Sequence, residues 1–571
     1  MRKTSNLVVV AFIVLCGLLA FLRLAPRGTQ GGALPLPGMP GRSAAGGNAI
    51  EVLFSSSDGK KEWVDAVTER FHRSNPQVNG HPVHVTVNHM RSGESRQKIL
   101  DGKEKPTIWG PAGPSWVTLI NRDWQLREKQ PFLEAVRPTV RTGLVIAMWE
   151  PMAQALGWPG KKLGWSDVVR VAQNPKGWSA YGHPEWGQFR FGHAHPDYSN
   201  SAMLSVIAEI YAGVGKTRGL TVADLRSPKV VAAVRATEQA IVHYGESSSW
   251  LVEKLCANGP SYLSALTVYE SSVVKANTQY PDKPFRIVSI YPREGTFWED
   301  HPAGIVTASW VTADQRAAAK QYLDYLNAAE PQQQASEFGF RPTQAGITLQ
   351  APFDQEHGVD PAQSGRPELE YVSQEVFNRA NELWHQVKKK ASVFLVLDTS
   401  RSMQGAPIEA AKAGAANFVK HLERDDDIRA WTFNSAITEL GSGGRAGAVA
   451  EEMSGRFGGL FASGGTALYD AVARALQAAE QQRRRTTTPR LYAIVVLSDG
   501  VDTNSHNTKS DLLSLLPNSE AAEGTRIFTI AYGKEADKAT LQRIAEESNG
   551  RMFAGGTDDV EKIYTSIAAY F

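Results

Sequence analysis

The sequence has few cysteines, almost no net charge and a single long apolar run. Its 571 residues contain two cysteines, Cys16 and Cys256, and the formal net charge at pH 7 is +2. Two cysteines exclude a disulfide framework, and the balanced charge gives no reason to expect a nucleic acid as partner. The phosphate-cradling Gly-x-x-x-x-Gly-Lys segment and the Gly-x-Ser-x-Gly nucleophile elbow are also absent from the sequence. We therefore expect a protein that is not an enzyme.

The N-terminal segment has the composition of a targeting sequence. Arg2 and Lys3 precede an apolar run over residues 7–22, which is barely long enough to cross a bilayer. No convincing small-x-small cleavage site follows the run, and Leu15 stands before Cys16 where a lipoprotein signal has a small residue.

We therefore expect residues 1–24 to be a retained, single-pass anchor in the cell membrane, with a cleaved signal peptide as the alternative. Residues 25–48 are rich in Gly, Pro and Ala and are expected to form a flexible linker. Arg23 and Arg27 balance the basic residues before the run, so charge does not set the orientation. The domains that follow lead us to place the bulk outside the cytoplasm, at the cell surface or in the periplasm.

A pattern of strand, small polar loop and helix recurs from residue 49 onward. Ile50, Val52 and Phe54 alternate as in a strand, a Ser-rich loop follows, and a helix is expected from about residue 61 to 72. This recurrence indicates an α/β fold with parallel strands, in which ligands bind at the carboxyl ends of the strands.

Several short segments of this region share their order with a known family. They are residues 52–57, 144–152, 157–159, 164–167, 195–201 and the run 301–342. In this order they resemble an extracellular solute-binding protein of the periplasmic type, near the branch related to molybdate-binding receptors. The resemblance covers residues 49–390 and implies a two-lobed clamshell with a closing cleft and a second lobe at about 147–295. The chain should cross between lobes near Gly143–Glu150 and return near Ile287–Ala303.

Hydroxyl side chains at loop and helix-start positions are the candidate ligands of that cleft. Without Arg or Lys nearby they would suit a small oxyanion or a neutral polar solute, although helix capping is the commoner use of serine. His193, His195 and Asp197 have a spacing that could bind zinc. The two histidines have no third strong ligand near them, so we expect a turn or cleft-rim role for this segment. The cleft candidates are Ser56, Ser57, Ser92, Ser115, Ser201 and Tyr269.

Two apolar strands in the last third of the chain each end in a polar loop. Residues 393–397 run into Asp398-Thr-Ser400-Arg-Ser402, residues 491–497 run into Ser498-Asp499-Gly500, and Ser463-Gly-Gly-Thr466 opens a helix between them. Because loops at the carboxyl ends of a doubly wound sheet meet at one edge, they should form one site. Two carboxylates and three hydroxyls are the hard oxygen donors that Mg²⁺ prefers. The two aspartates only balance the charge of the ion, which keeps an open position for a carboxylate from another molecule.

These loops resemble the metal-ion-dependent adhesion site of von Willebrand factor type A domains, over residues 391–571. The resemblance implies a doubly wound, Rossmann-like domain that binds Mg²⁺, or else Mn²⁺ or Ca²⁺, and a protein partner that offers an acidic residue. Arg401 stands where the family commonly has glycine, so it should narrow the mouth of the site or add a positive rim. The implied metal ligands are Asp398, Ser400 and Ser402 from the first loop, Thr466 from the second and Asp499 from the third.

The two halves of the chain are predicted to be coupled. A helix expected over residues 371–390 is followed almost directly by the strand at Val393, with no flexible linker. The leading hypothesis is a membrane-anchored binding protein that holds its partner through the metal, with the clamshell as sensor or scaffold. The alternatives are a solute receptor for an ABC-type transporter and an accessory protein for assembly or metal insertion that acts with an ATPase.

Overall fold

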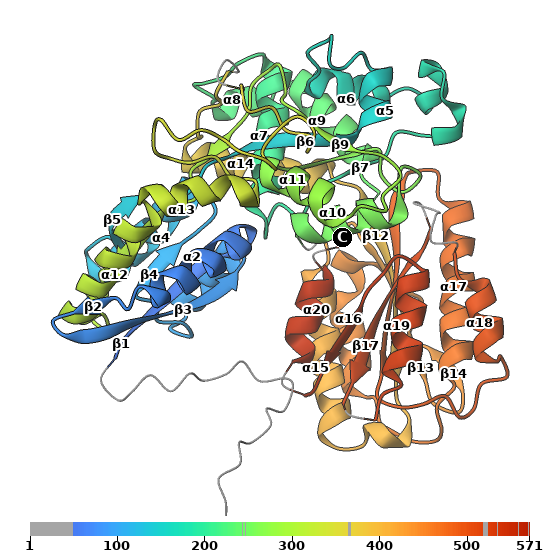
Figure 1. Cartoon of the computed structure of the whole chain (residues 1–571). Helices are drawn as coiled ribbons and strands as arrows, with labels where there is room; N and C mark the ends of the chain where they lie inside the picture. Colours follow the sequence, from blue (N-terminus) through green and yellow to red (C-terminus); the bar gives the residue numbers. More distant parts are fainter. Residues whose placement is uncertain are drawn as a thin grey trace, which may run out of the picture. The chain divides into compact units, whose positions relative to one another are not determined.

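The computed structural model describes residues 49–571 except 243, 246, 364–366, 518–523, 534, 558 and 569. The anchor and linker predicted for residues 1–48 lie outside this part of the chain. No helix in the described part is both long and apolar enough to cross a bilayer. Residues Ala49–Phe571 form one unit, which contains three β-sheets among its described residues (Figure 1).

The first lobe is built on a sheet whose central strands are parallel, as the strand–loop–helix recurrence predicts. Strand β11 instead runs antiparallel to β4 and β5, because it enters the sheet on the return from the second lobe. The strand order is β2 (Gln77–Val78), β3 (His81–Met90), β1 (Ile50–Ser57), β4 (Ile108–Gly110), β11 (Ala303–Val306) and β5 (Leu133–Arg137). The helices are α2 (Lys61–Arg73), α3 (Ser92–Leu100), α4 (Pro114–Glu128), α12 (Ala313–Leu326) and α13 (Ala329–Gln334).

The second lobe has a mixed sheet centred on a fully buried strand, β6 (Thr142–Trp149). The remaining strands are β8 (Ala265–Tyr269), β9 (Ile287–Ile290), β10 (Trp298–Glu299) and β7 (Phe191–Gly192). Since β5 ends in the first sheet at Arg137, the chain changes lobes before Thr142, and the lobe begins before residue 147. The expected crossover at Gly143–Glu150 is thus a strand whose apolar run is buried on both faces.

The helices of the second lobe cover this sheet and supply several helix N-termini to the first lobe's side. They are α5 (Glu150–Ala155), α6 (Trp165–Ala172), α7 (Asn200–Val214), α8 (Val222–Leu225), α9 (Pro228–Ala240), α10 (Ser248–Asn258) and α11 (Glu270–Gln279).

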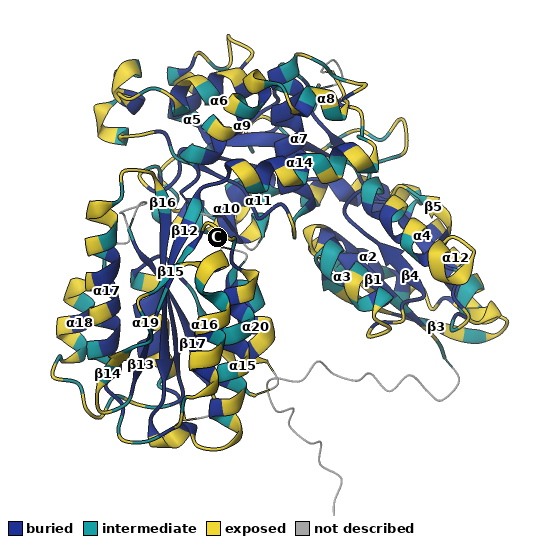
Figure 2. Ribbon diagram, turned by 180° about the vertical axis from the view of Figure 1, so that it is seen from behind, coloured by how far each residue is buried: buried dark blue, intermediate teal, exposed yellow. Residues whose placement is uncertain are grey.

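The C-terminal domain is a doubly wound sheet with helices on both faces (Figures 1 and 2). Strand β12 (Lys390–Asp398) lies near the middle of this sheet. Its residues Val393, Leu395 and Leu397 face one core while Phe394 and Val396 face the other, as strand alternation requires. The strands are β14 (Ile437–Glu439), β13 (Asp427–Phe433), β12 (Lys390–Asp398), β16 (Arg490–Ser498), β17 (Arg526–Tyr532) and β18 (Met552–Gly555), and β15 (Gly444–Arg445) pairs with β13. The helices are α15 (Ala406–His421), α16 (Ala446–Gly458), α17 (Leu468–Arg485), α18 (Lys509–Leu515), α19 (Lys538–Glu547) and α20 (Val560–Ala568).

Helix α14 (Gln374–Val387) joins the second lobe to this domain, and only Lys388 and Lys389 separate it from β12. The Lys389 ammonium donates to the Ile241 carbonyl at 2.7 Å, and Lys388 donates to the Phe571 carbonyl at 2.6 Å. One continuous apolar core includes residues of β6, α14, α15 and α20. The C-terminal domain therefore packs against the second lobe, as the short connection predicts.

Candidate functional site

The first and third predicted metal loops lie side by side because their strands are neighbours. Leu397 of β12 pairs with Leu497 of β16, so Asp398 and Ser498 end adjacent strands. The Ser498 hydroxyl donates to Asp398 Oδ2 at 2.7 Å, and the Ser400 amide donates to Asp398 Oδ1 at 2.8 Å. These two hydrogen bonds fix the orientation of the Asp398 carboxylate at the carboxyl edge of the sheet.

The hydroxyls of the first loop connect this carboxylate to Asp499. Ser400 Oγ and Ser402 Oγ lie 3.0 Å apart, and Ser402 Oγ donates to Asp499 Oδ1 at 2.7 Å. Ser402 is exposed, whereas Asp398, Ser400 and Asp499 are buried. Four of the five predicted ligands thus form one hydrogen-bonded chain that is open to solvent at Ser402.

The second loop brings Thr466 to the same place. Its backbone N–H donates to Thr503 Oγ1 at 2.9 Å, and its carbonyl accepts from the Thr503 amide at 2.8 Å, which fastens it to the third loop. A methyl group added at Gly500 would lie 3.7 Å from both Ser402 Oγ and Thr466 Oγ1. The two hydroxyls therefore face a common point above Gly500, and all five predicted ligands are gathered there.

The electrostatics of the site favour a divalent cation. Burial raises the pKa of Asp398 to about 6, and the nearby Asp499 charge adds to this, against hydrogen bonds from Ser400 and Ser498. Burial also raises the pKa of Asp499. Two carboxylates lie close to three hydroxyls, and none of the contacts described above involves a cationic side chain. This set of oxygen donors fits Mg²⁺. No cluster of three or more His, Cys, Asp or Glu side chains suited to a metal occurs in the described residues, so any metal here depends on the hydroxyls.

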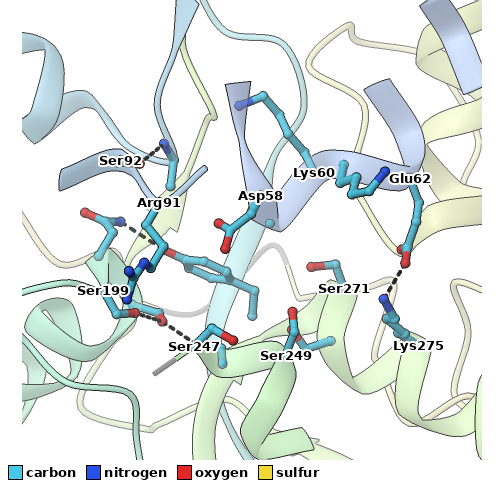
Figure 3. Close-up of a pocket in the computed structure, with 18 of the residues that line it drawn as sticks. Asp58, Lys60, Glu62, Arg91, Ser92, Ser199, Ser247, Ser249, Ser271 and Lys275 are labelled. Carbon is cyan, nitrogen blue, oxygen red and sulfur yellow. Dashed lines mark hydrogen bonds and ion pairs between the residues drawn. The ribbon is translucent and has the colours of Figure 1, made fainter. Parts of the chain in front are cut away.

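The cleft candidates are only partly brought together. Ser92, Ser201 and Tyr269 line one cavity of about 320 Å³ between the lobes (Figure 3). Ser56 and Ser57 do not line it and are almost fully buried, and Ser57 Oγ accepts from the buried Lys60 ammonium at 2.7 Å. Ser115 lines a different hollow, next to Tyr371. Ser56, Ser57 and Ser115 are thus not among the residues that line the cavity with Ser92, Ser201 and Tyr269, and their role as ligands stays a prediction.

The cavity is also lined by charged residues that are not among the cleft candidates predicted from the sequence. Figure 3 shows the Asp58 carboxylate between Arg91 on one side and Ser249 and Ser271 on the other. Burial raises the pKa of Asp58, although Arg91 opposes this. Arg91 stands directly before Ser92 in the sequence, and this neighbour was the available signal. The cavity is therefore not a purely neutral site.

Helix N-termini add fixed partial positive charge to the same cavity. Helices α3, α7, α10 and α11 begin at or next to lining residues, and the N-terminal amides of helices attract anions. On the second lobe, Ser201 Oγ lies 2.8 Å from Ser248 Oγ, and Ser247 caps α10. The cavity thus combines an anion-attracting side with the Asp58 carboxylate, which can accept hydrogen bonds.

The match to known families decides the assignment. The family described as bacterial extracellular solute-binding protein matches residues 52–341, just over half of the chain. The chain belongs to this family. A von Willebrand factor type A domain matches residues 392–565. Together a solute-binding domain and a type A domain support an extracellular binding role, since both are typically binding domains rather than enzymes.

Individual proteins are similar to parts of this chain. The periplasmic binding protein P5PA is 15% identical over 59% of this chain and 99% of its own, with a TM-score of 0.40. A von Willebrand factor type A protein from Catenulispora acidiphila is 17% identical over 32% of this chain and 42% of its own, with a TM-score of 0.29. Inter-alpha-trypsin inhibitor heavy chain H4 from Sus scrofa is 26% identical over 174 residues, which are 30% of this chain but only 18% of that protein. The chain thus spans less than a fifth of this curated relative.

Proposed function

We propose that the type A domain binds Mg²⁺ through Asp398, Ser400, Ser402, Thr466 and Asp499 and uses the ion to hold an acidic residue of a partner protein. The solute-binding domain serves as a sensor or scaffold, and residues 1–24 anchor the chain in the cell membrane with its bulk outside the cytoplasm. The observation that carries this proposal is the convergence of the five side chains from three loops at one sheet edge.

The donor set explains why binding, rather than catalysis, is proposed. When bound, Mg²⁺ would supply an electrophile with a coordination position left for an external carboxylate. Asp398 and Asp499 would balance its charge, and the three hydroxyls would complete the protein's share of the oxygen ligands. The hydrogen bonds from Ser498 and the Ser400 amide keep the Asp398 carboxylate oriented for this.

The direct test is calorimetric titration of Mg²⁺ and Mn²⁺ into the fragment Ala49–Phe571, which forms one unit. Wild type should bind, and Asp398→Ala should show no detectable binding. Thr466→Val removes one hydroxyl with little change in shape and should weaken binding ~10-fold, about 1.4 kcal/mol. Asp425→Ala, at an exposed carboxylate of the same domain, is the matched control and should bind normally. A folded wild type that binds neither ion would refute the proposal.

The cavity favours a second candidate function, that of a solute receptor. Because it holds both Arg91 and Asp58, we propose that it binds a solute with an anionic group and a separate hydrogen-bond donor. The solute predicted from the sequence was a simple oxyanion or a neutral polar molecule. A fully deprotonated oxyanion has no group that can donate a hydrogen bond to the Asp58 carboxylate, so the proposed solute carries a donor as well.

Three probes separate these chemistries: glycerol 3-phosphate carries both groups, sulfate only the anion and glycerol only the donors. Tryptophan fluorescence should show that glycerol 3-phosphate binds most tightly. Arg91→Gln should weaken its binding ~10-fold or more, because a charge-assisted contact is lost, whereas Arg122→Gln, at an exposed arginine, should not. Asp58→Asn should strengthen sulfate binding, because it removes the repulsion between the Asp58 carboxylate and an anion that has no donor. Sulfate binding that is unchanged in this variant would contradict the role of Asp58.

A further inference from the structure

Two large apolar side chains are exposed beside the proposed metal site. Phe461 is 76% exposed and Val501 is 55% exposed. The other large apolar side chains that are exposed in the described part of the chain, Leu126, Val136, Phe285 and Leu515, belong to other segments. Single exposed apolar residues are common on protein surfaces, but these two border the same site.

Their position follows from the hydrogen bonds of the metal loops. The loop that carries Phe461 is tied to the first metal loop, since the Ser463 amide donates to the Thr399 carbonyl at 2.8 Å and Gln404 Nε2 donates to the Ala462 carbonyl at 3.3 Å. Val501 directly follows Gly500, the residue over which the Ser402 and Thr466 hydroxyls converge. The second and third metal loops therefore each present one apolar side chain next to the ligands.

Arg401 gives the same surface its charge. Its backbone N–H donates to the Gly464 carbonyl at 3.1 Å, so it lies where the first and second loops meet, and its side chain is exposed. With a divalent ion balancing Asp398 and Asp499, the exposed guanidinium of Arg401 places a positive charge beside the ion. Charge complementarity therefore favours an acidic partner over a basic one.

We propose that this surface, which we call the metal face (Arg401, Phe461, Val501 and the five metal ligands), binds a partner protein through a segment in which an acidic residue has apolar neighbours and a second acidic residue follows nearby. The inference rests on the proposed metal-dependent function. The first acidic residue completes the metal coordination, Phe461 and Val501 cover the apolar neighbours, and Arg401 pairs with the second acid. Apolar anchors around a polar centre are the usual composition of a binding hot spot.

Selection of random peptides displayed on phage, against the full-length chain in Mg²⁺ with elution by EDTA, tests the proposal. The eluted sequences should contain Asp or Glu with Leu, Ile, Val, Met or Phe within two positions, well above the frequency in the starting library. The double variant Phe461→Ser/Val501→Ser should still select acidic peptides but lose the apolar neighbours. Leu126→Ser, at an exposed leucine of the solute-binding domain, is the matched control and should select the same sequences as wild type.

The possible outcomes separate this inference from the function on which it rests. Acidic peptides without apolar enrichment, or apolar enrichment that survives in the double variant, would overturn the inference and leave the metal-dependent function standing. Recovery of no EDTA-released sequence would overturn both. Metal-dependent dimerisation of the chain, measured by sedimentation in the same buffer, would assign the metal face to a second copy and overturn the proposed partner.

Discussion

His385 is the side chain through which α14 contacts both neighbouring domains. Its Nδ1 lies 2.5 Å from Glu423 Oε1 in the type A domain, and its Nε2 lies 3.3 Å from Asp197 Oδ1 in the second lobe. Burial lowers the pKa of His385, but hydrogen bonds and charge interactions with Asp197 and Glu423 outweigh this and raise the pKa to about 9. The ion pairs therefore depend on protonation of a single imidazole.

This pKa predicts a pH-dependent stability. Since the folded value lies above the ordinary value of about 6.5, the contribution is complete below pH ~6.5 and is lost as pH rises through about 9. The difference in unfolding free energy between wild type and His385→Gln should be largest at pH 6 and shrink by roughly 1–2 kcal/mol at pH 10, allowing for partial exposure. Urea unfolding at several pH values measures it. Glu423→Gln should also reduce the pH dependence of the unfolding free energy. A difference between wild type and His385→Gln that stays constant with pH would contradict the raised pKa of His385.

Among single residues, the sequence predicts the placement of some much better than that of others. The positions of Asp398 and Asp499 follow from sequence because each stands directly at the end of an apolar strand, and neighbouring strands bring their ends together. Asp58 and Arg91 follow strands in the same way, but whether their side chains point into a cavity depends on the opposing lobe. That lobe is folded from residues far along the chain, so local pattern does not reveal it.

Among the elements, α14 is the one whose packing joins the domains. Trp384 is fully buried, its Nε1 donates to Glu238 Oε2 at 3.0 Å, and its ring lies edge-on to that of Tyr244 at 5.4 Å. Replacement by alanine leaves a cavity and removes a donor from a buried carboxylate.

We expect Trp384→Ala to lower the unfolding free energy by about 3–5 kcal/mol. Because the second lobe and the type A domain share one core, calorimetry of wild type should show them unfolding in a single transition, which this variant should split. Trp310→Ala, in the first lobe's own cluster, should lower stability without splitting that transition. Separate transitions already present in wild type would show that the shared core does not couple the domains.

Among the strands, the sequence predicts some pairings but not others. The parallel strands β3, β1 and β4 follow from the repeated strand–loop–helix pattern. The antiparallel pairing of β11 with β4 and β5 does not, because the strands of the second lobe separate β11 from β4 and β5 in the sequence. The crossover that the resemblance predicts at Gly143–Glu150 coincides with most of β6, a strand that is buried along its whole length.

For the whole molecule, the segment His195–Ser201 connects the cavity between the lobes to helix α14. Tyr198 and Ser201 line the solute cavity, while His195 and Asp197 contact Trp384 and His385 of α14. A change in the cavity therefore has a short, packed route to the junction with the type A domain. This route is the physical basis for proposing the clamshell as a sensor.

The central position of β12 also has a mechanical consequence. Its carboxyl end carries Asp398 and its amino end follows α14, and it is hydrogen-bonded along nearly its whole length to β13 on one side and β16 on the other. A partner that pulled on the metal site would load these bonds along the strand axis, so they would have to break together rather than one after another. Forced unfolding is governed by that barrier and not by equilibrium stability, so β12 would resist tension applied between the proposed metal site at its carboxyl end and α14 at its amino end.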